Sequence, residues 1–121
     1  APDEALIMAS LGLAYLRQED TVPARRYLLK SVSLQGNYAQ SRLGLGYVHL
    51  QKWQYAQALS HLEKSMKLLP TLEASFLLAE VQQNIGQNDK ARDLYLIVAS
   101  SDRTGKLGQL AQSRLQQLKS K

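Results

Sequence analysis

The stretch Leu11-Gly12-Leu13-Ala14-Tyr15-Leu16 decides the fold, because it returns in altered form as Leu45-Gly46-Tyr47-Val48-His49-Leu50. The offset from Leu11 to Leu45 also relates further pairs along the chain, which are Ala24 and Ala58, Leu28 and Leu62, Ser31 and Ser65, and Leu34 and Leu68. A fixed period of this length, about 34 residues, is the signature of a repeat protein, in which each copy is one supersecondary unit.

A third and weaker copy begins near Leu72. Leu78-Ala79 takes the place of the earlier Leu-Gly pair, and the step from Ala58 to Ala91 is one residue shorter than the step from Ala24 to Ala58, so one residue has been lost from a turn. Glycine costs about 1 kcal/mol relative to alanine in a helix interior, so its recurrence in the first two copies needs a packing reason. We expect these small residues to let the first helix of each hairpin approach the second closely.

Apolar periodicity and turn signals divide the copies into helices. In residues 55–68, Ala58, Leu62 and Met66 recur at helical spacing, while Glu63 lies on the opposite side. Turn residues such as Gln35-Gly36-Asn37 separate the periodic stretches. The patterns predict helices near residues 3–18, 22–35, 38–52, 55–69, 72–85, 88–100 and 105–119.

With these residues in place, the chain resembles the tetratricopeptide repeat family, whose pattern is W-x2-L-G-x2-Y, then A-x3-F, then P. The matching residues are Met8, Leu11, Gly12, Tyr15, Ala24, Leu28 and Gly36 in copy one, Arg42, Leu45, Gly46, His49, Ala58, Leu62 and Pro70 in copy two, and Ser75, Leu78, Ala79, Gln82, Ala91 and Tyr95 in copy three. The third copy departs most from the pattern and has no proline at its end.

The resemblance covers about residues 5–103 and implies an all-α fold. It is an α-α superhelix, a solenoid of the tetratricopeptide type, built from three helical hairpins and a capping helix. The expected repeats are at about 5–38, 39–71 and 72–103, and the capping helix is at about 105–119, all within one domain over residues 1–121.

The last helix carries an apolar stripe, made of Leu107, Leu110, Ala111, Leu115 and Leu118, and its cations Lys106, Arg114 and Lys119 fall mostly outside that stripe. The end of a repeat array exposes an apolar face that must be covered, so we expect this helix to cap the array. The alternative is that it also swaps between chains or contacts a partner.

The composition excludes several functions. Cysteine is absent, which rules out disulfides, thiolate catalysis and thiolate zinc sites. The net charge of +5 is concentrated in residues 101–121, and a basic end without interleaved aromatics indicates a solvated helix rather than a nucleic-acid surface. No apolar run is long enough to span a bilayer. The given residues open at Ala1-Pro2-Asp3-Glu4 with no signal peptide, and we expect either a mature form or an excised fragment.

The sequence offers no catalytic, metal or cofactor site. His49 stands where the family usually has tyrosine, facing its own hairpin partner, and His61 lies on a second helix. Neither has the acidic neighbours or the H-x-x-x-H spacing of a metal site. No serine lies in a nucleophile elbow and no glycine-rich loop is present. We therefore expect a protein that is not an enzyme and that needs no cofactor or metal.

In the resembled family, ligands lie against the first helices, on the concave side of the array. The residues that match ligand-facing places and that we select as the partner-binding groove are Leu13, Arg17, Leu43, Tyr47, Leu50, Phe76 and Glu80. Its centre is apolar. Chaperone-adaptor members grip a terminal carboxylate with Lys and Asn at places that are here Ala9, Leu13, Leu43 and Tyr47, so that clamp is absent. The competing interpretation is that Leu13, Tyr47 and Phe76 only pack adjacent first helices together.

These observations predict a protein-protein interaction module that binds an amphipathic helix or an apolar peptide segment. The alternative is a self-associating structural module, a homo-oligomer. The loose, Gln- and Ser-rich repeats resemble bacterial members of the family, including lipoproteins that assist envelope assembly. A bacterial assembly or envelope complex is therefore the expected setting, while a cytoplasmic and a periplasmic location both stay open.

Overall fold

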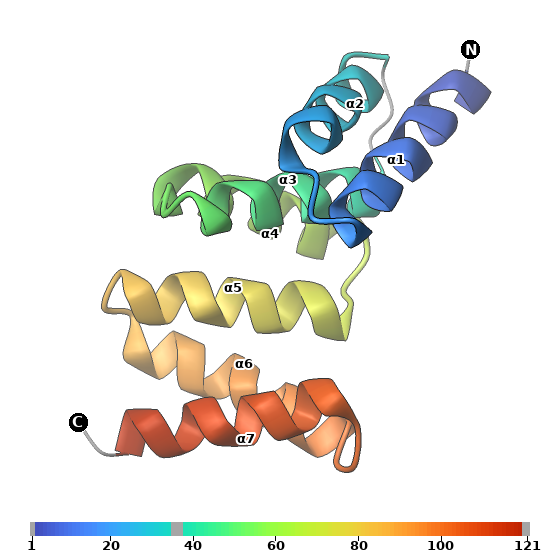
Figure 1. Ribbon diagram of the computed structural model, residues 1–121. Coiled ribbons are helices and arrows are strands. Elements are labelled where there is room, and N and C mark those ends of the chain that lie inside the picture. Colours follow the sequence, from blue (N-terminus) through green and yellow to red (C-terminus); the bar gives the residue numbers. More distant parts are fainter. Residues whose placement is uncertain (1, 35–37, 120–121) are drawn as a thin grey trace. The chain divides into compact units, whose positions relative to one another are not determined.

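The computed structural model describes residues 2–34 and 38–119, and each regular element in these ranges is an α-helix (Figure 1). The helices are α1 (Pro2–Arg17), α2 (Thr21–Ser33), α3 (Ala39–Gln51), α4 (Tyr55–Leu68), α5 (Leu72–Asn84), α6 (Asn88–Ser101) and α7 (Lys106–Lys119). Their bounds agree with the predicted ranges to within two residues. The predicted turn at Gln35, Gly36 and Asn37 lies outside the described residues.

One turn geometry joins the two helices of every hairpin. Glu19, Trp53 and Gly86 each adopt a positive φ, of 59°, 58° and 85°. They are separated by the same two offsets that relate the three copies of the repeat. Each of them donates its N–H to a carbonyl three residues earlier, and the following residue bonds five residues back, as Trp53 does to Leu50 at 3.0 Å and Gln54 to His49 at 2.9 Å. The repeat therefore extends to the backbone conformation of the turns.

The predicted close approach of the paired helices is confirmed. A Cβ added to Gly12 would lie 2.6 Å from Cγ of Leu28, and one added to Gly46 would lie 2.5 Å from Cγ of Leu62. Both leucines are fully buried. Glycine is needed at these places because the opposing leucine fills the space that a side chain would take.

Contacts within the chain group into two compact units, Ala1–Leu69 and Pro70–Lys121. In the first unit, α3 packs against both α2 and α1. A buried serine joins these helices, because Ser31 Oγ donates to the carbonyl of Ala5 at 2.8 Å and lies 3.0 Å from Ser41 Oγ. Ser65 repeats this bond one period later, donating to the carbonyl of Ala39 at 2.9 Å.

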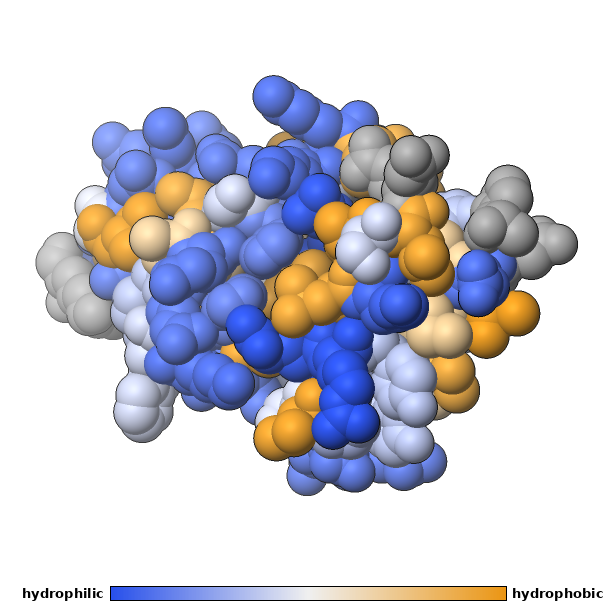
Figure 2. Space-filling view, turned by 90° about the horizontal axis from the view of Figure 1, so that it is seen from above, coloured by the Kyte–Doolittle hydropathy of each residue, from blue (hydrophilic) through white to orange (hydrophobic). Residues whose placement is uncertain are grey.

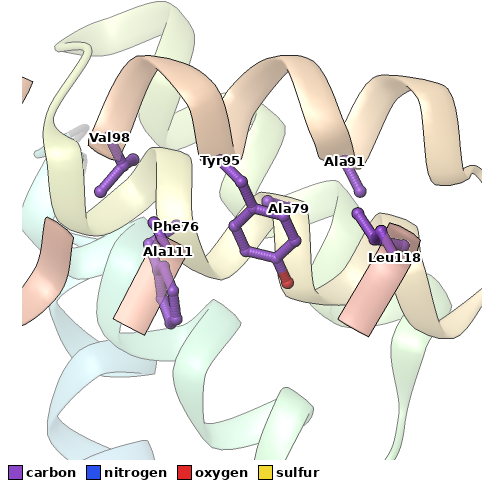
Figure 3. Packing of buried hydrophobic residues seen from close by; sticks show 7 residues of the cluster. All are labelled: Phe76, Ala79, Ala91, Tyr95, Val98, Ala111 and Leu118. Carbon is purple, nitrogen blue, oxygen red and sulfur yellow. The ribbon is translucent and has the colours of Figure 1, made fainter. Parts of the chain in front are cut away.

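The second unit is built on a core cluster that α5, α6 and α7 share. Its buried members are Phe76, Ala79, Ala91, Tyr95, Val98, Ala111 and Leu118 (Figure 3). Two residues of the predicted capping stripe, Ala111 and Leu118, are buried there, whereas Leu110 is 40% exposed. α7 packs against α6 and α5, the same pairing by which α3 packs against α2 and α1. The prediction of one domain over residues 1–121 stays a prediction.

Candidate protein-binding surface

The predicted groove residues of the first unit lie on α1 and α3, which pack against each other. Leu13, Leu43, Tyr47 and Leu50 are half-buried, and Arg17 is exposed. The Tyr47 hydroxyl accepts a hydrogen bond from the Gln51 side chain one turn later on α3. This first-helix surface thus offers partly exposed aliphatic side chains beside a tyrosine whose hydroxyl is already positioned.

Phe76 does not share that exposure. Its side chain is only 5% exposed and belongs to the core cluster of the second unit. The ring meets Tyr95 edge-on, with 5.6 Å between the ring centroids, and the Arg114 guanidinium lies 5.9 Å from the Phe76 centroid. Phe76 is therefore a packing residue that joins α5 to α6 and α7.

Glu80, the remaining predicted groove residue, lines a polar pocket between α5 and α7. The pocket has a volume of about 430 Å³ and is lined by Glu80, Gln83, Asn84, Arg114 and Gln117. Glu80 Oε2 lies 3.6 Å from Nη2 of Arg114. Burial raises the pKa of Glu80 above its ordinary value of 4.5, and the positive charge of Arg114 opposes that rise with a smaller effect.

A tyrosine beneath this pocket orients one of its amides. The Tyr95 hydroxyl donates to Gln83 Oε1 at 2.8 Å. Burial raises the pKa of Tyr95 well above its ordinary value of 10, and the nearby Glu80 carboxyl raises it further, so the hydroxyl stays protonated and keeps donating. The pocket thus combines carboxamides with a carboxyl and a guanidinium, groups that recognise peptide backbone or polar side chains by hydrogen bonding.

Arg114 and Gln117 were not predicted as site residues. The sequence interpretation placed Arg114 outside the apolar stripe of the last helix, but its side chain is half-buried against Phe76 and Glu80. The sequence spacing could have predicted this burial. Arg114 follows Ala111 by three residues and precedes Leu118 by four, which puts it on the same helix face as these buried residues. Long cationic side chains often bury their stems in this way while the charged end stays near solvent.

The two histidines, which the sequence interpretation kept apart, form a stacked pair in the first unit. The ring centroids of His49 and His61 are 5.4 Å apart, and Arg42 Nη1 lies 3.3 Å from His61 Nδ1. Burial first and the positive charge of Arg42 second together lower the pKa of His61 from 6.5 to about 4. Tyr15 and Tyr27 stack one period earlier, with ring centroids 5.5 Å apart. The same two places of the repeat therefore hold a stacked ring pair in both the first and the second copy.

Residues 2–34 and 38–119 contain neither a cluster of metal-binding side chains nor a helix suited to cross a membrane. Within them, no three acidic or histidine side chains gather closely enough to hold a metal ion. None of the helices in residues 2–34 and 38–119 combines the length and apolar character that crossing a membrane requires.

Paired helices that recur at a fixed period, with small residues at the crossing and a closing helix, are the features of a helical-repeat fold of the tetratricopeptide type. Solved structures show the same fold. The chain is similar to the Arabidopsis OM64 TPR domain, with a TM-score of 0.80, 16% identity, and coverage of 95% of this chain and 96% of that one.

It is also similar to the N-terminal domain of stress-induced protein-1 (STI-1) from C. elegans, with a TM-score of 0.68, 17% identity, and coverage of 93% of this chain and 94% of that one. No protein-family model and no curated protein matches the sequence. The structural likeness confirms the predicted all-α fold of the tetratricopeptide type.

Proposed function

We propose that this chain is a protein-interaction module that binds a peptide segment of a partner on its first helices. The observation that carries this proposal is the first-helix surface of the first unit, where Leu13, Leu43 and Leu50 are only half-buried around Tyr47. Apolar and aromatic side chains that keep part of their surface exposed are the usual anchors of protein interfaces. The tetratricopeptide fold supports the same function.

The chemistry of the surface narrows the kind of segment it binds. Ala9 is buried, and Leu13, Leu43 and Tyr47 carry no charge, so no cation is present at these places to hold a terminal carboxylate. An amphipathic helix or an extended apolar segment fits the surface better, because its apolar side chains would contact the exposed parts of these residues. In the second unit, the polar pocket around Glu80 and Arg114 offers hydrogen bonds to a polar stretch of a peptide.

Selection of binding peptides tests this proposal. Peptides are selected from a display library against the full chain, and their affinity is then measured for Tyr47→Ala and for Leu43→Ala. We expect at least a tenfold loss for Tyr47→Ala, which corresponds to about 1.4 kcal/mol and is typical of an aromatic anchor. Val22→Ala is the matched control, because Val22 is 68% exposed and lies on α2, outside the surface.

The result that would refute the proposal is a set of selected peptides whose affinity is unchanged by both substitutions. Circular dichroism of each variant shows whether a loss of affinity reflects loss of fold. Tyr47→Phe separates the ring from the hydroxyl, and we expect it to keep most of the affinity if the ring is the anchor.

Self-association is the second candidate, because α6 exposes two adjacent apolar side chains. Leu96 is 49% exposed and Ile97 is 52% exposed. If this surface joins two copies, sedimentation velocity should show a mass that rises with concentration, and Ile97→Ser should return the chain to a monomer. A mass that does not change with concentration would remove this candidate.

A further inference from the structure

The outer face of α1 carries apolar side chains at places that the repeat buries elsewhere. In the second copy, Ser41 contacts Ser31 of α2, and a Cβ added to Gly44 would lie 2.8 Å from Cδ1 of Leu28 on α2. One period earlier, the place of Ser41 is taken by Ile7, which is 54% exposed. In the second copy, α2 packs on this face of α3. The matching face of α1 is apolar, and no helix in the described residues packs on it.

A second pair shows the same contrast. Leu45 of α3 is fully buried, whereas Leu11, its counterpart on α1, is 38% exposed. Leu11 adjoins both Ile7 and Met8 on the helix surface, since it follows the first by four residues and the second by three. The apolar face therefore runs along about one turn of α1.

This face continues into a groove at the junction of α1 and α2. The groove has a volume of about 460 Å³ and is lined by Met8, Arg26, Tyr27, Leu29, Lys30 and Ser33. The Tyr27 ring is held in place by its parallel stack on Tyr15, at an interplanar angle of 2°. Figure 2, which looks down on the side where α1 and α2 lie, shows separate orange patches among blue side chains.

The charged side chains that α2 contributes beside the groove are all positive. α2 contains Arg25, Arg26 and Lys30 and no acidic residue. In the part of the chain that the structure describes, no carboxylate lies within ion-pair distance of Arg26 or Lys30. The matching groove on α4 differs, because Ser60 replaces Arg26, Glu63 replaces Leu29, and the volume falls to about 260 Å³.

From these observations we propose that the outer face of α1 and the adjoining groove form a second docking surface, whose occupant is an amphipathic helix with an acidic flank. Apolar side chains at helical spacing would contact Ile7, Leu11 and Met8, much as α2 covers α3. Carboxylates on the flank would then face Arg26 and Lys30, where charge-assisted pairs form. This surface uses none of the residues of the proposed function, so either one can fail alone.

Two synthetic helical peptides test the inference on the full chain. One carries leucines at positions i, i+3, i+4 and i+7 with glutamates beside them, and the other has lysines in place of the glutamates. We expect fluorescence anisotropy to show at least tenfold tighter binding of the glutamate peptide at low salt. High salt should reduce that preference, because the Debye length shrinks to about 3 Å at 1 M.

Charge reversal locates the site on the chain. Arg26→Glu with Lys30→Glu should abolish the preference for the glutamate peptide or reverse it. Lys64→Glu is the matched control, because Lys64 stands one period after Lys30, in the groove of α4. Ile7→Ser tests the apolar part and should weaken both peptides equally.

Three outcomes would overturn the proposal. The first is equal affinity for the two peptides. The second is that Lys64→Glu reduces the preference for the glutamate peptide as much as the reversal of Arg26 and Lys30 does. The third is a dimer in sedimentation that Ile7→Ser converts to a monomer, which would mean that a second copy covers this face. Peptides whose binding depends on Tyr47 should keep their affinity when the charges of Arg26 and Lys30 are reversed.

Discussion

At the scale of single residues, two of the hairpin turns place a residue other than glycine where the backbone conformation favours glycine. The turn between paired helices requires a positive φ, which glycine adopts freely and other residues adopt at a cost of about 1 kcal/mol or more. Only the third hairpin has glycine there, at Gly86, while the first two have Glu19 and Trp53. Trp53 is 78% exposed, so its side chain contributes little packing in return.

We therefore expect Glu19→Gly and Trp53→Gly each to raise the free energy of unfolding by about 0.5–1 kcal/mol. Relief of the positive φ outweighs the extra entropy that glycine gives the unfolded chain. Urea denaturation followed by circular dichroism measures the change, since Trp53 is the only tryptophan and its fluorescence is lost. Gly86→Ala is the reverse control and should destabilise by about 1 kcal/mol. Destabilisation by both glycine variants would contradict the explanation.

At the scale of the helical element, the hairpin crossing is the feature that the sequence predicted most fully. Gly12 and Gly46 were selected from their period alone, and each lies against a buried leucine of the second helix, in agreement with the predicted close approach. The side chains of α7 were harder to predict, because this helix lies outside the repeat and its register against α5 is fixed only by packing. Phe76 was selected as a groove residue, with packing as the alternative, and its burial comes from contacts with Tyr95 and Arg114 that the repeat pattern does not predict.

The crossing gives a prediction for Gly46→Val. Valine gains a little in helix propensity over glycine, but its Cβ would lie 2.5 Å from Cγ of Leu62, which is fully buried and would have to shift within the core. Overpacking of a tight core costs about 1–3 kcal/mol, so we expect a net loss of stability in that range. Chemical denaturation measures it.

A double-mutant cycle with Leu62→Ala distinguishes this cause from others. If Leu62 is the obstacle, the double variant should be more stable than the sum of the single effects implies, by about 1 kcal/mol or more. Strict additivity would show that valine at this place acts through something other than contact with Leu62.

At the scale of the whole molecule, each unit contains one titratable group whose shifted pKa contributes to the acid response, and the two contributions have opposite sign. His61, in the first unit, has its pKa lowered to about 4 from 6.5 by burial and by the charge of Arg42. A depressed pKa means that the unfolded chain binds the proton first, so this stabilisation is complete above pH 6.5 and is lost as the pH falls towards 4. Glu80, in the second unit, has a raised pKa, so its contribution is complete below pH 4.5 and lost as the pH rises above that value.

Lowering the pH from 7 to 4 should therefore loosen the first unit before the second. Hydrogen exchange by mass spectrometry, corrected for the intrinsic pH dependence of exchange, should show protection falling in α3 and α4 while it persists in α5 and α6. The first hairpin supplies the matched variant, because Tyr15 and Tyr27 occupy the places of His49 and His61 one period earlier. Replacing both histidines with tyrosine should remove most of the acid sensitivity of α3 and α4. Loosening of both units at the same pH, or an unchanged profile in the tyrosine variant, would mean that groups other than His61 set the acid response.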